Sequence, residues 1–350
     1  MSDTPASGMP FPSADQPSAD QPGADQPGAL AGPGASSARQ AVLALRDEVG
    51  KVVVGQEGAL SGLVAALLVR GHVLLEGVPG VAKTLLVKTL ARALDLDFKR
   101  VQFTPDLMPS DVTGQTILDG VEGGFRFREG PVFTNLLLAD EINRTPPKTQ
   151  AALLEAMEER QVSVEGASRR LPDPFIVIAT QNPVEYEGTY PLPEAQLDRF
   201  LFKLLVGYPT FEQESLVLQR HHEGLDPHDI AGAGVQPVAT IDDLAQARLE
   251  VDQIQVEPVV LHYIVSLCRA TRETPSIELG ASPRGAAALL HAAKAWAWLS
   301  GRAFLTADEV KAVAKPVLRH RLLVRPELEL EGTTADGVLD SLLAAVPAPR

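Results

Sequence analysis

The chain has 350 residues, of which 45% are hydrophobic, so it can bury a substantial core, and we expect two folded units preceded by a tail. Its 45 acidic and 31 basic residues give a formal net charge of −14, and no dense run of Lys and Arg is present, so a nucleic acid is not an expected partner. No apolar stretch reaches the ~20 residues that span a bilayer, and the N-terminus lacks a basic region followed by an apolar one. We therefore expect a cytoplasmic protein without a transmembrane segment.

The first 38 residues are rich in Pro, Ala, Gly, Ser and Asp. The pentad Ser-Ala-Asp-Gln-Pro occurs at 13–17 and 18–22, and Gly-Ala-Asp-Gln-Pro follows at 23–27. Such residues bury too little apolar surface to offset the conformational entropy lost on ordering. Residues 1–38 are therefore predicted to be a disordered leader.

Between residues 39 and 222, short apolar runs alternate with helical patterns. The runs predicted to be strands are 72–75, 100–103, 136–139, 175–179 and 201–206. This alternation is typical of a parallel sheet that is covered by helices on both faces. We therefore predict an α/β core with a five-stranded parallel sheet over residues 39–222.

Two further segments read as hairpins. Residues 116–133 place Ile117, Phe125 and Phe127 on either side of Gly-rich turn residues, and a second hairpin is expected at 162–171. The first hairpin has two open interpretations, an edge hairpin that packs its own aromatic side chains or a loop that grips a substrate.

The pattern changes after residue 222. A connection rich in Gly, Asp and Pro leads into helical periods at 241–254, 258–272, 283–299 and 306–321, which predict an all-helical domain over 223–345. His221, His222 and His228 lie in or beside this connection, where solvated linker residues are a better interpretation than metal ligands. Cys268 lies on an apolar helical face and is expected to be a core thiol in a reducing compartment.

A loop that suits a phosphate follows the first predicted strand. It reads Gly77, Val78, Pro79, Gly80, Val81, Ala82, Lys83 and Thr84, with Leu85 opening an apolar helical face. Glycines let backbone N–H groups surround phosphate oxygens, and the N-terminus of a helix adds the positive end of its dipole. Lys83 would neutralise phosphate charge and Thr84 would hold Mg²⁺, although the strict pattern has Gly where this chain has Ala82. An ordinary Gly-rich turn would not require Lys-Thr at this point.

Polar residues also end two other predicted strands. Asp140 and Glu141 follow the run 136–139, at the strand end where ligands of open α/β sheets bind. Asp140 would contribute to the Mg²⁺ shell and Glu141 would polarise the attacking water. Asn182 follows the run 175–179 and could orient the same water. The alternatives are solvated cap residues for the acids and a turn-forming Asn before Pro183.

These residues together resemble the AAA+ ATPases, and the MoxR branch in particular. The matching segments are 77–84 with its Ala-Lys-Thr ending, 140–147 (DEINRTPP), and 182–183 with 187–200 (EGTYPLPEAQLDRF). The similarity extends from about residue 41 to about residue 323. It implies the AAA+ P-loop αβα sandwich followed by a helical lid.

The resemblance also implies roles for individual residues. Val54, Gly55 and Gln56, which follow Val53, resemble the segment that contacts adenine and ribose. Asn182 resembles the first sensor, Arg199 the arginine finger and Arg284 the second sensor on the lid. A guanidinium from a neighbouring protomer can stabilise the transition state of phosphoryl transfer, which would require a ring. Without the resemblance, a local ion pair would be the preferred role for Arg199.

The function that this resemblance implies is ATP hydrolysis with Mg²⁺ in a ring, expected to be a hexamer, that remodels or matures client proteins. A partner with a von Willebrand factor A domain is expected alongside. Two alternatives remain open at this point: the ATPase subunit of a magnesium-chelatase-like complex, and a nucleotide-gated binding module with little turnover.

Overall fold

The computed structural model describes residues 36–118, 125–183 and 188–349. By their contacts these residues form two compact units, one made of residues up to 47, 57–69 and 242 onward, and the other of residues 48–56 and 70–241. The expected domains, 39–222 and 223–345, are each continuous in the chain, whereas each of the two units is made of separate segments. The reason is that the apolar helix α2 (Glu57–Leu68) packs against α10 (Pro283–Leu299). Most of the leader, residues 1–35, lies outside the described residues.

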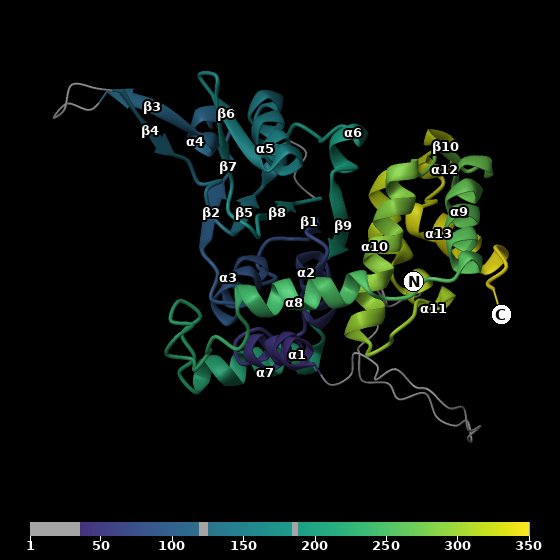
Figure 1. The fold of residues 1–350 in the computed structure, drawn as a ribbon, viewed down its shortest axis with the longest axis horizontal. Coiled ribbons are helices and arrows are strands. Elements are labelled where there is room, and N and C mark those ends of the chain that lie inside the picture. Colours follow the sequence, from purple (N-terminus) through teal and green to yellow (C-terminus); the bar gives the residue numbers. More distant parts are fainter. Residues whose placement is uncertain (1–35, 119–124, 184–187, 350) are drawn as a thin grey trace. The chain divides into compact units, whose positions relative to one another are not determined.

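The unit of residues 48–56 and 70–241 is built on a five-stranded sheet in which neighbouring strands are parallel, in the order β2-β5-β8-β1-β9 (Figure 1). The strands are β1 (His72–Glu76), β2 (Phe98–Gln102), β5 (Leu136–Asp140), β8 (Ile176–Gln181) and β9 (Phe200–Leu205). The predicted five-stranded parallel sheet is thus confirmed. The expectation that every strand is apolar is wrong for β2, which lies at the edge of the sheet and carries charged, exposed side chains, as edge strands commonly do.

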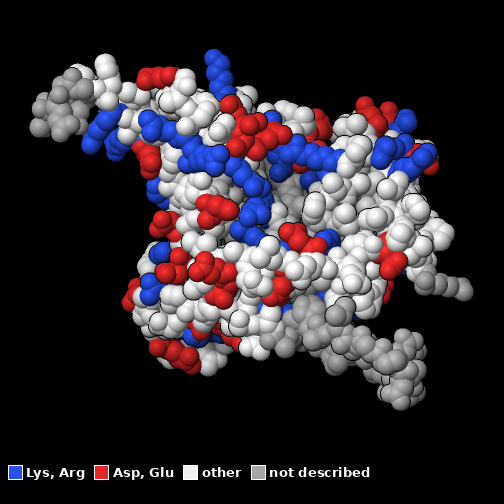
Figure 2. Space-filling model, viewed as in Figure 1, with Lys and Arg blue, Asp and Glu red and all other residues white. Residues whose placement is uncertain are grey.

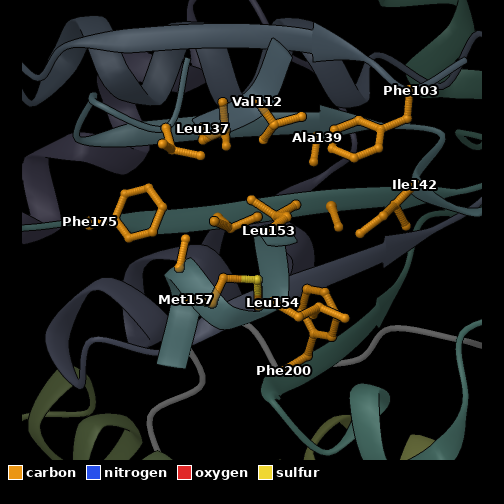
Figure 3. Close-up of a cluster of buried hydrophobic side chains, with 14 of the residues drawn as sticks. Phe103, Val112, Leu137, Ala139, Ile142, Leu153, Leu154, Met157, Phe175 and Phe200 are labelled. Carbon is orange, nitrogen blue, oxygen red and sulfur yellow. The ribbon is translucent and has the colours of Figure 1, made fainter. Parts of the chain in front are cut away.

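Helix α5 (Pro147–Glu159) covers one face of this sheet. Leu153, Leu154 and Met157 of α5 meet Leu137 and Phe200 of the strands in one buried cluster (Figure 3). The strand side chains of the opposite parity, such as Leu75, Leu138 and Ile178, are also buried, so both faces of the sheet are covered. The remaining helices of this unit are α3 (Lys83–Ala93), α4 (Pro109–Thr113), α6 (Glu194–Leu197) and α7 (Phe211–His222).

Two antiparallel hairpins belong to the same unit: β3 (Gly114–Leu118) with β4 (Phe125–Glu129), and β6 (Gln161–Val164) with β7 (Ala167–Arg170). They lie side by side (Figure 1), joined by a 2.9 Å hydrogen bond from Thr116 to Glu165 and by Arg169 stacked 4.2 Å over the ring of Phe127. Residues 119–124 between β3 and β4 lie outside the described residues. Both interpretations of the first hairpin remain open. Phe127 packs against Phe133, as expected for a hairpin that packs its own aromatic side chains, whereas Phe125 is 80% exposed, as expected for a loop that grips a substrate. Lys and Arg side chains gather over this region, with acidic side chains among them (Figure 2).

The other unit is mainly helical. Its elements are α1 (Ser37–Gly50, which continues into the other unit), α2, α8 (Ile241–Asp252), α9 (Pro258–Glu273), α10, α11 (Ala307–Leu318), α12 (Pro326–Leu330) and α13 (Ala335–Ala345). The expectation of an all-helical domain needs one correction, because β10 (Ile277–Leu279) pairs antiparallel with β11 (Leu323–Val324). These strands are too short to show a period of two in the sequence. Cys268 is fully buried in α9, as expected, and burial raises the pKa of its thiol to about 11.

No helix among the described residues is long and apolar enough to cross a membrane.

Candidate active site

The loop between β1 and α3 has a conformation that needs small residues. Gly80 has φ +85° and Ala82 has φ +60°, a left-handed conformation that suits Gly better than Ala. A Cβ on Gly77 would lie 2.3 Å from the carbonyl oxygen of Val206, just after β9, so only Gly fits there. Backbone that turns in this way presents successive N–H groups to one side, which is the arrangement that binds phosphate.

Lys83 opens helix α3 and folds back over the loop. Its Nζ donates to the carbonyl oxygens of Gly77 and of Val78, the latter at 3.2 Å. Burial lowers the pKa of Lys83, whereas the negative charges of Asp140, Glu141 and Glu76 act in the opposite direction. The ammonium group is therefore held beside the acidic ends of β5 and β1. Thr84 and Leu85 follow it in the first turn of α3.

The carboxylate of Asp140 is held by two neighbouring strands. Thr180, near the end of β8, donates its hydroxyl to Oδ1 at 2.5 Å. Arg100, on β2, donates to Oδ2 from Nη2 at 2.6 Å and from Nε at 3.0 Å. A carboxylate accepts about four hydrogen bonds or ligands, so Asp140 keeps capacity for a further partner.

Glu141 comes next and adopts a left-handed backbone conformation, with φ 57° and ψ 50°. Its N–H donates to the hydroxyl of Thr180 at 2.9 Å. Its Oε2 accepts hydrogen bonds from Gln102, at 2.6 Å, and from Arg144, at 3.0 Å. Backbone strain of this kind is often found at functional sites.

Asn182 directly follows β8 and is 7% exposed. The carbonyl oxygen of the preceding Gln181 accepts the N–H of Gly77 at 3.2 Å. Since β8 lies between β1 and β5, the polar ends of three adjacent strands meet at one edge of the sheet. Gly77, Asp140 and Asn182, widely spaced in the sequence, are thus neighbours at this edge.

The segment 54–56 lies beside the same edge. A Cβ on Gly55, which has φ +78°, would come within 2.5 Å of Oε1 of Gln213 on α7. The buried side chain of Gln56 donates to the carbonyl oxygen of Gly207 at 3.4 Å. Gly207 follows Val206, whose carbonyl oxygen lies against Gly77. The segment of Val54 and its neighbours therefore lies close to the loop, with the residues after β9 between them.

Arg199 lies away from this edge. It directly precedes β9, whose first residue, Phe200, pairs with His72 at the start of β1. Strand β1 rises roughly 13 Å from His72 to Glu76 before the loop begins. Nη2 of Arg199 instead forms a 2.9 Å ion pair with Glu158, at the end of α5. An ion pair of the kind considered for Arg199 therefore exists, with Glu158 as the partner.

Arg284 lies in the other unit, in the first turn of α10. Ser282 caps this helix by accepting the N–H of Gly285 at 3.2 Å. A Cβ on Gly285 would lie 3.1 Å from Cδ of the buried Arg321, so the backbone beside Arg284 is closely packed.

Four residues that hold the two carboxylates were missed by sequence reasoning: Arg100, Gln102, Arg144 and Thr180. Arg100 and Gln102 lie on β2 and Thr180 on β8, so each is remote in sequence from the carboxylate that it contacts. One usable signal was present, since the polar residues Gln102 and Thr180 lie at the ends of segments that read as strands. Arg144 was noted only as part of the motif at 140–147.

The oxygen donors of the site fit a hard divalent cation. Mg²⁺ prefers one or two protein oxygens together with phosphate oxygens and water, and the side chains of Thr84 and Asp140 supply such oxygens next to the loop. Among the described residues, no group of three or more His, Cys, Asp and Glu side chains is arranged to hold a metal ion.

Comparisons with known proteins agree with this geometry. Residues 72–202 match the model of the ATPase family associated with various cellular activities (AAA), and residues 269–342 match that of the AAA lid domain. The chain is 48% identical over 303 residues to the uncharacterized protein YeaC of Bacillus subtilis, covering 87% of this chain and 93% of that protein. It is 41% identical over 312 residues to Chaperone MoxR1 of Mycobacterium tuberculosis, covering 87% and 81%.

A solved structure extends the similarity to three dimensions. The crystal structure of a protein from Cytophaga hutchinsonii, proposed to be an ATPase, superposes with a TM-score of 0.82 at 41% identity. The match covers 89% of this chain and 96% of that one. This chain therefore resembles the Cytophaga hutchinsonii protein in both sequence and fold over most of its length.

Proposed function

The chain belongs to the MoxR family of AAA+ ATPases, and on that premise we propose that it binds ATP with Mg²⁺ at residues 77–84 and hydrolyses it at an interface between protomers of a ring. The nucleotide-binding segment would comprise 54–56 and 77–85. Lys83 would neutralise the β- and γ-phosphate charge. The observation that carries the proposal is the meeting of Lys83, Asp140, Glu141 and Asn182 at one edge of the sheet.

The roles in hydrolysis follow from what each group can do. Thr84 and Asp140 would hold Mg²⁺, which offsets the negative charge of the phosphates when bound. Glu141 would accept the proton of the attacking water, and Asn182 would orient that water. Arg284 is proposed to reach the phosphates from the lid.

Arg199 would act on the nucleotide of a neighbouring protomer. Arg199 precedes Phe200, which pairs with His72 at the start of β1, whereas the loop follows the other end of β1. Arg199 therefore lies at the edge of the sheet opposite to the loop of its own protomer, and this position supports a role in trans. A residue that serves the next subunit implies a head-to-tail interface, and such interfaces form a ring when the rotation between subunits closes. We propose a ring of six protomers in the cytoplasm.

Client remodelling is the work that we propose for hydrolysis. The name of the mycobacterial relative, Chaperone MoxR1, supports this proposal. The side chains of Phe125 and Leu118 in the β3–β4 hairpin also support it, because they are 80% and 65% exposed and could contact a client. A partner with a von Willebrand factor A domain is part of the proposal. Proteins captured on the Glu141→Gln variant in extract of its own cell, and identified by mass spectrometry, would test both expectations.

The test of the enzymatic proposal is steady-state ATP hydrolysis. Wild-type protein should release phosphate, whereas Glu141→Gln and Arg199→Ala should each lose turnover while retaining nucleotide binding. Mixing these two variants should restore activity, because about one quarter of the interfaces in a randomly mixed closed ring would pair an intact site with an intact arginine. Wild-type turnover equal to that of Glu141→Gln, with both assembled, would contradict the proposal. Absence of recovery on mixing would contradict only the role of Arg199 in trans.

A further inference from the structure

Helix α5 reaches the Glu141 turn at one end and Arg199 at the other. Its first turn carries Gln150, whose side chain is fully buried, and its last turn carries Glu158, which pairs with Arg199 at 2.9 Å. The two positions are separated by about 12 Å of helix. The helix therefore connects the edge of the sheet where β5 ends with the edge where β9 begins.

The side chain of Gln150 joins two separate segments. Its Nε2 donates to the carbonyl oxygen of Ile142 at 3.2 Å and to that of Tyr190 at 3.0 Å. The N–H of Tyr190 in turn donates to the carbonyl oxygen of Asn143 at 2.6 Å. Ile142 and Asn143 form the 3₁₀ turn that begins directly after Glu141. This buried connection fastens the turn after Glu141 to the segment that leads to Arg199, and hydrogen bonds shielded from water hold their geometry well.

The chain from Tyr190 to Arg199 is short and has little freedom. Pro191 and Pro193 have fixed φ angles, and Leu192 between them is buried. Helix α6 follows, and the N–H of Arg199 donates to the carbonyl oxygen of the third residue of this helix, at 3.2 Å. A displacement at Tyr190 would therefore be transmitted to Arg199 with little loss.

Gln150 is not explained by stability alone. Its Oε1 is buried, and among the described residues no group donates a hydrogen bond to it. A buried oxygen without a donor is destabilising, whereas Leu or Met would fill a similar volume without a polar group. The two bonds from Nε2 are the feature that an apolar residue could not provide.

We propose that Gln150 is a positioning residue, which couples the nucleotide state of a protomer's own site to the arginine that the protomer offers to its neighbour. This inference rests on the proposed function, since it requires Arg199 to act in trans. A change at Glu141 moves the carbonyl oxygens of Ile142 and Asn143, and with them the segment 190–199. The ion pair between Glu158 and Arg199 gives α5 a second hold on the same segment.

The test uses rings mixed from two kinds of full-length protomer. The receiver is Arg199→Ala, which keeps an intact site and supplies no arginine. The donor keeps Arg199 and is either Glu141→Gln, which holds ATP, or Lys83→Ala, which stays largely empty at an ATP concentration well below its weakened affinity. Turnover by the receiver should differ at least about fivefold between the two donors, a coupling of ordinary size. Adding Gln150→Leu to both donors should bring this ratio below about twofold.

The matched control places Gln150→Leu in the receiver, where the difference between the donors should persist. A merely structural role for Gln150 would lower activity with both donors and leave their ratio unchanged, which would overturn the proposal. Equal activity with the two donors before Gln150 is changed would also overturn it. Wild-type protein without ATPase activity would instead refute the proposed function itself.

A second measurement requires no mixing and does not depend on entry of Lys83→Ala into rings. In the Glu141→Gln variant, ATP should change hydrogen–deuterium exchange at amides of residues 188–199. The change should be absent when Gln150→Leu is added, with ATP affinity retained within about threefold, as expected for a residue outside the binding loop. Persistence of the exchange change in the double variant would refute the coupling.

Discussion

The hydroxyl of Thr180 donates a hydrogen bond to Oδ1 of Asp140 at 2.5 Å and joins the ends of the neighbouring strands β8 and β5. The same hydroxyl oxygen accepts the N–H of Glu141 at 2.9 Å. One side chain therefore orients both acidic residues of the proposed site. Because β8 also pairs with β1, which leads into residues 77–84, Thr180 connects the acids to the strand that carries the phosphate-binding loop.

Replacing Thr180 by Val should lower turnover about ten- to a hundredfold, since a buried hydrogen bond to a charged group is worth roughly 1.5–3 kcal/mol. Val keeps the shape of Thr but cannot donate to Asp140 or accept from Glu141. Steady-state phosphate release measures the effect.

Thr180→Ser should retain most activity. Thr134→Val is a matched control, because the hydroxyl of Thr134 is buried without a hydrogen-bond partner among the described residues. Equal losses in Thr180→Val and Thr134→Val would show that the hydroxyl of Thr180 has no special role.

Lys83→Ala should weaken ATP binding by at least roughly ten- to a hundredfold, the value of one charge-assisted hydrogen bond to phosphate. The ammonium group already lies against the carbonyl oxygens of Gly77 and Val78, so little reordering is needed to bind. Titration with a fluorescent ATP analogue measures the affinity. Lys88→Ala, an exposed lysine on the same helix, serves as the control and should bind normally. Near-native affinity in Lys83→Ala would remove Lys83 from the role proposed for it.

Ala82→Gly should raise the free energy of unfolding by up to about 1.5 kcal/mol. A non-Gly residue in the left-handed region costs roughly 1–2 kcal/mol, and Gly returns roughly 0.4–1 kcal/mol of this through the greater entropy of the unfolded chain. Urea denaturation provides the measurement. Ala91→Gly makes the same chemical change inside helix α3 and should destabilise by about 1 kcal/mol or more. Destabilisation by both substitutions would argue against strain at Ala82.

His72 should make stability depend on pH below neutrality. Burial lowers the pKa of His72 to about 4, with the neutral ring accepting the N–H of Val177 at Nδ1 and contacting the carbonyl oxygen of Met157 through Nε2. An unfolded His titrates near pH 6.5, so the unfolded chain binds the additional proton between about pH 6.5 and 4. The contribution of the neutral His72 ring to the free energy of unfolding is complete above about pH 6.5 and is lost as the pH falls towards 4. It amounts to about 3 kcal/mol.

Urea denaturation at several pH values, compared between wild type and His72→Phe, measures this contribution. The wild type should show the steeper loss of stability between pH 6.5 and 4.5. NMR of the imidazole provides a direct check, because the ring should remain neutral at pH 5. A ring of His72 that is protonated at pH 6 in the folded protein would contradict the prediction.

Much of the fold follows from local patterns in the sequence. The apolar runs of β1, β5, β8 and β9 predicted a parallel sheet, and the helical periods after residue 240 predicted the second unit, both of which the structure and the family models confirm. The errors occurred where local patterns carry little information. Strand β2 pairs on one side only, and β10 with β11 is too short to have a readable period. The roles of the individual site residues remain predictions.

The sequence by itself determined which groups the loop offers, since the flexible backbone of Gly80, the charge of Lys83 and the hydroxyl of Thr84 lie within a few residues of one another. Only the tertiary structure decided what surrounds the acids. Arg100 and Thr180 each lie 40 residues from Asp140, and Glu158 lies 41 residues before Arg199. Side chains so far apart meet only because the strand order β2-β5-β8-β1-β9 and the return of α5 across the sheet bring them together. That order arises from packing of the whole core, and no local pattern encodes it.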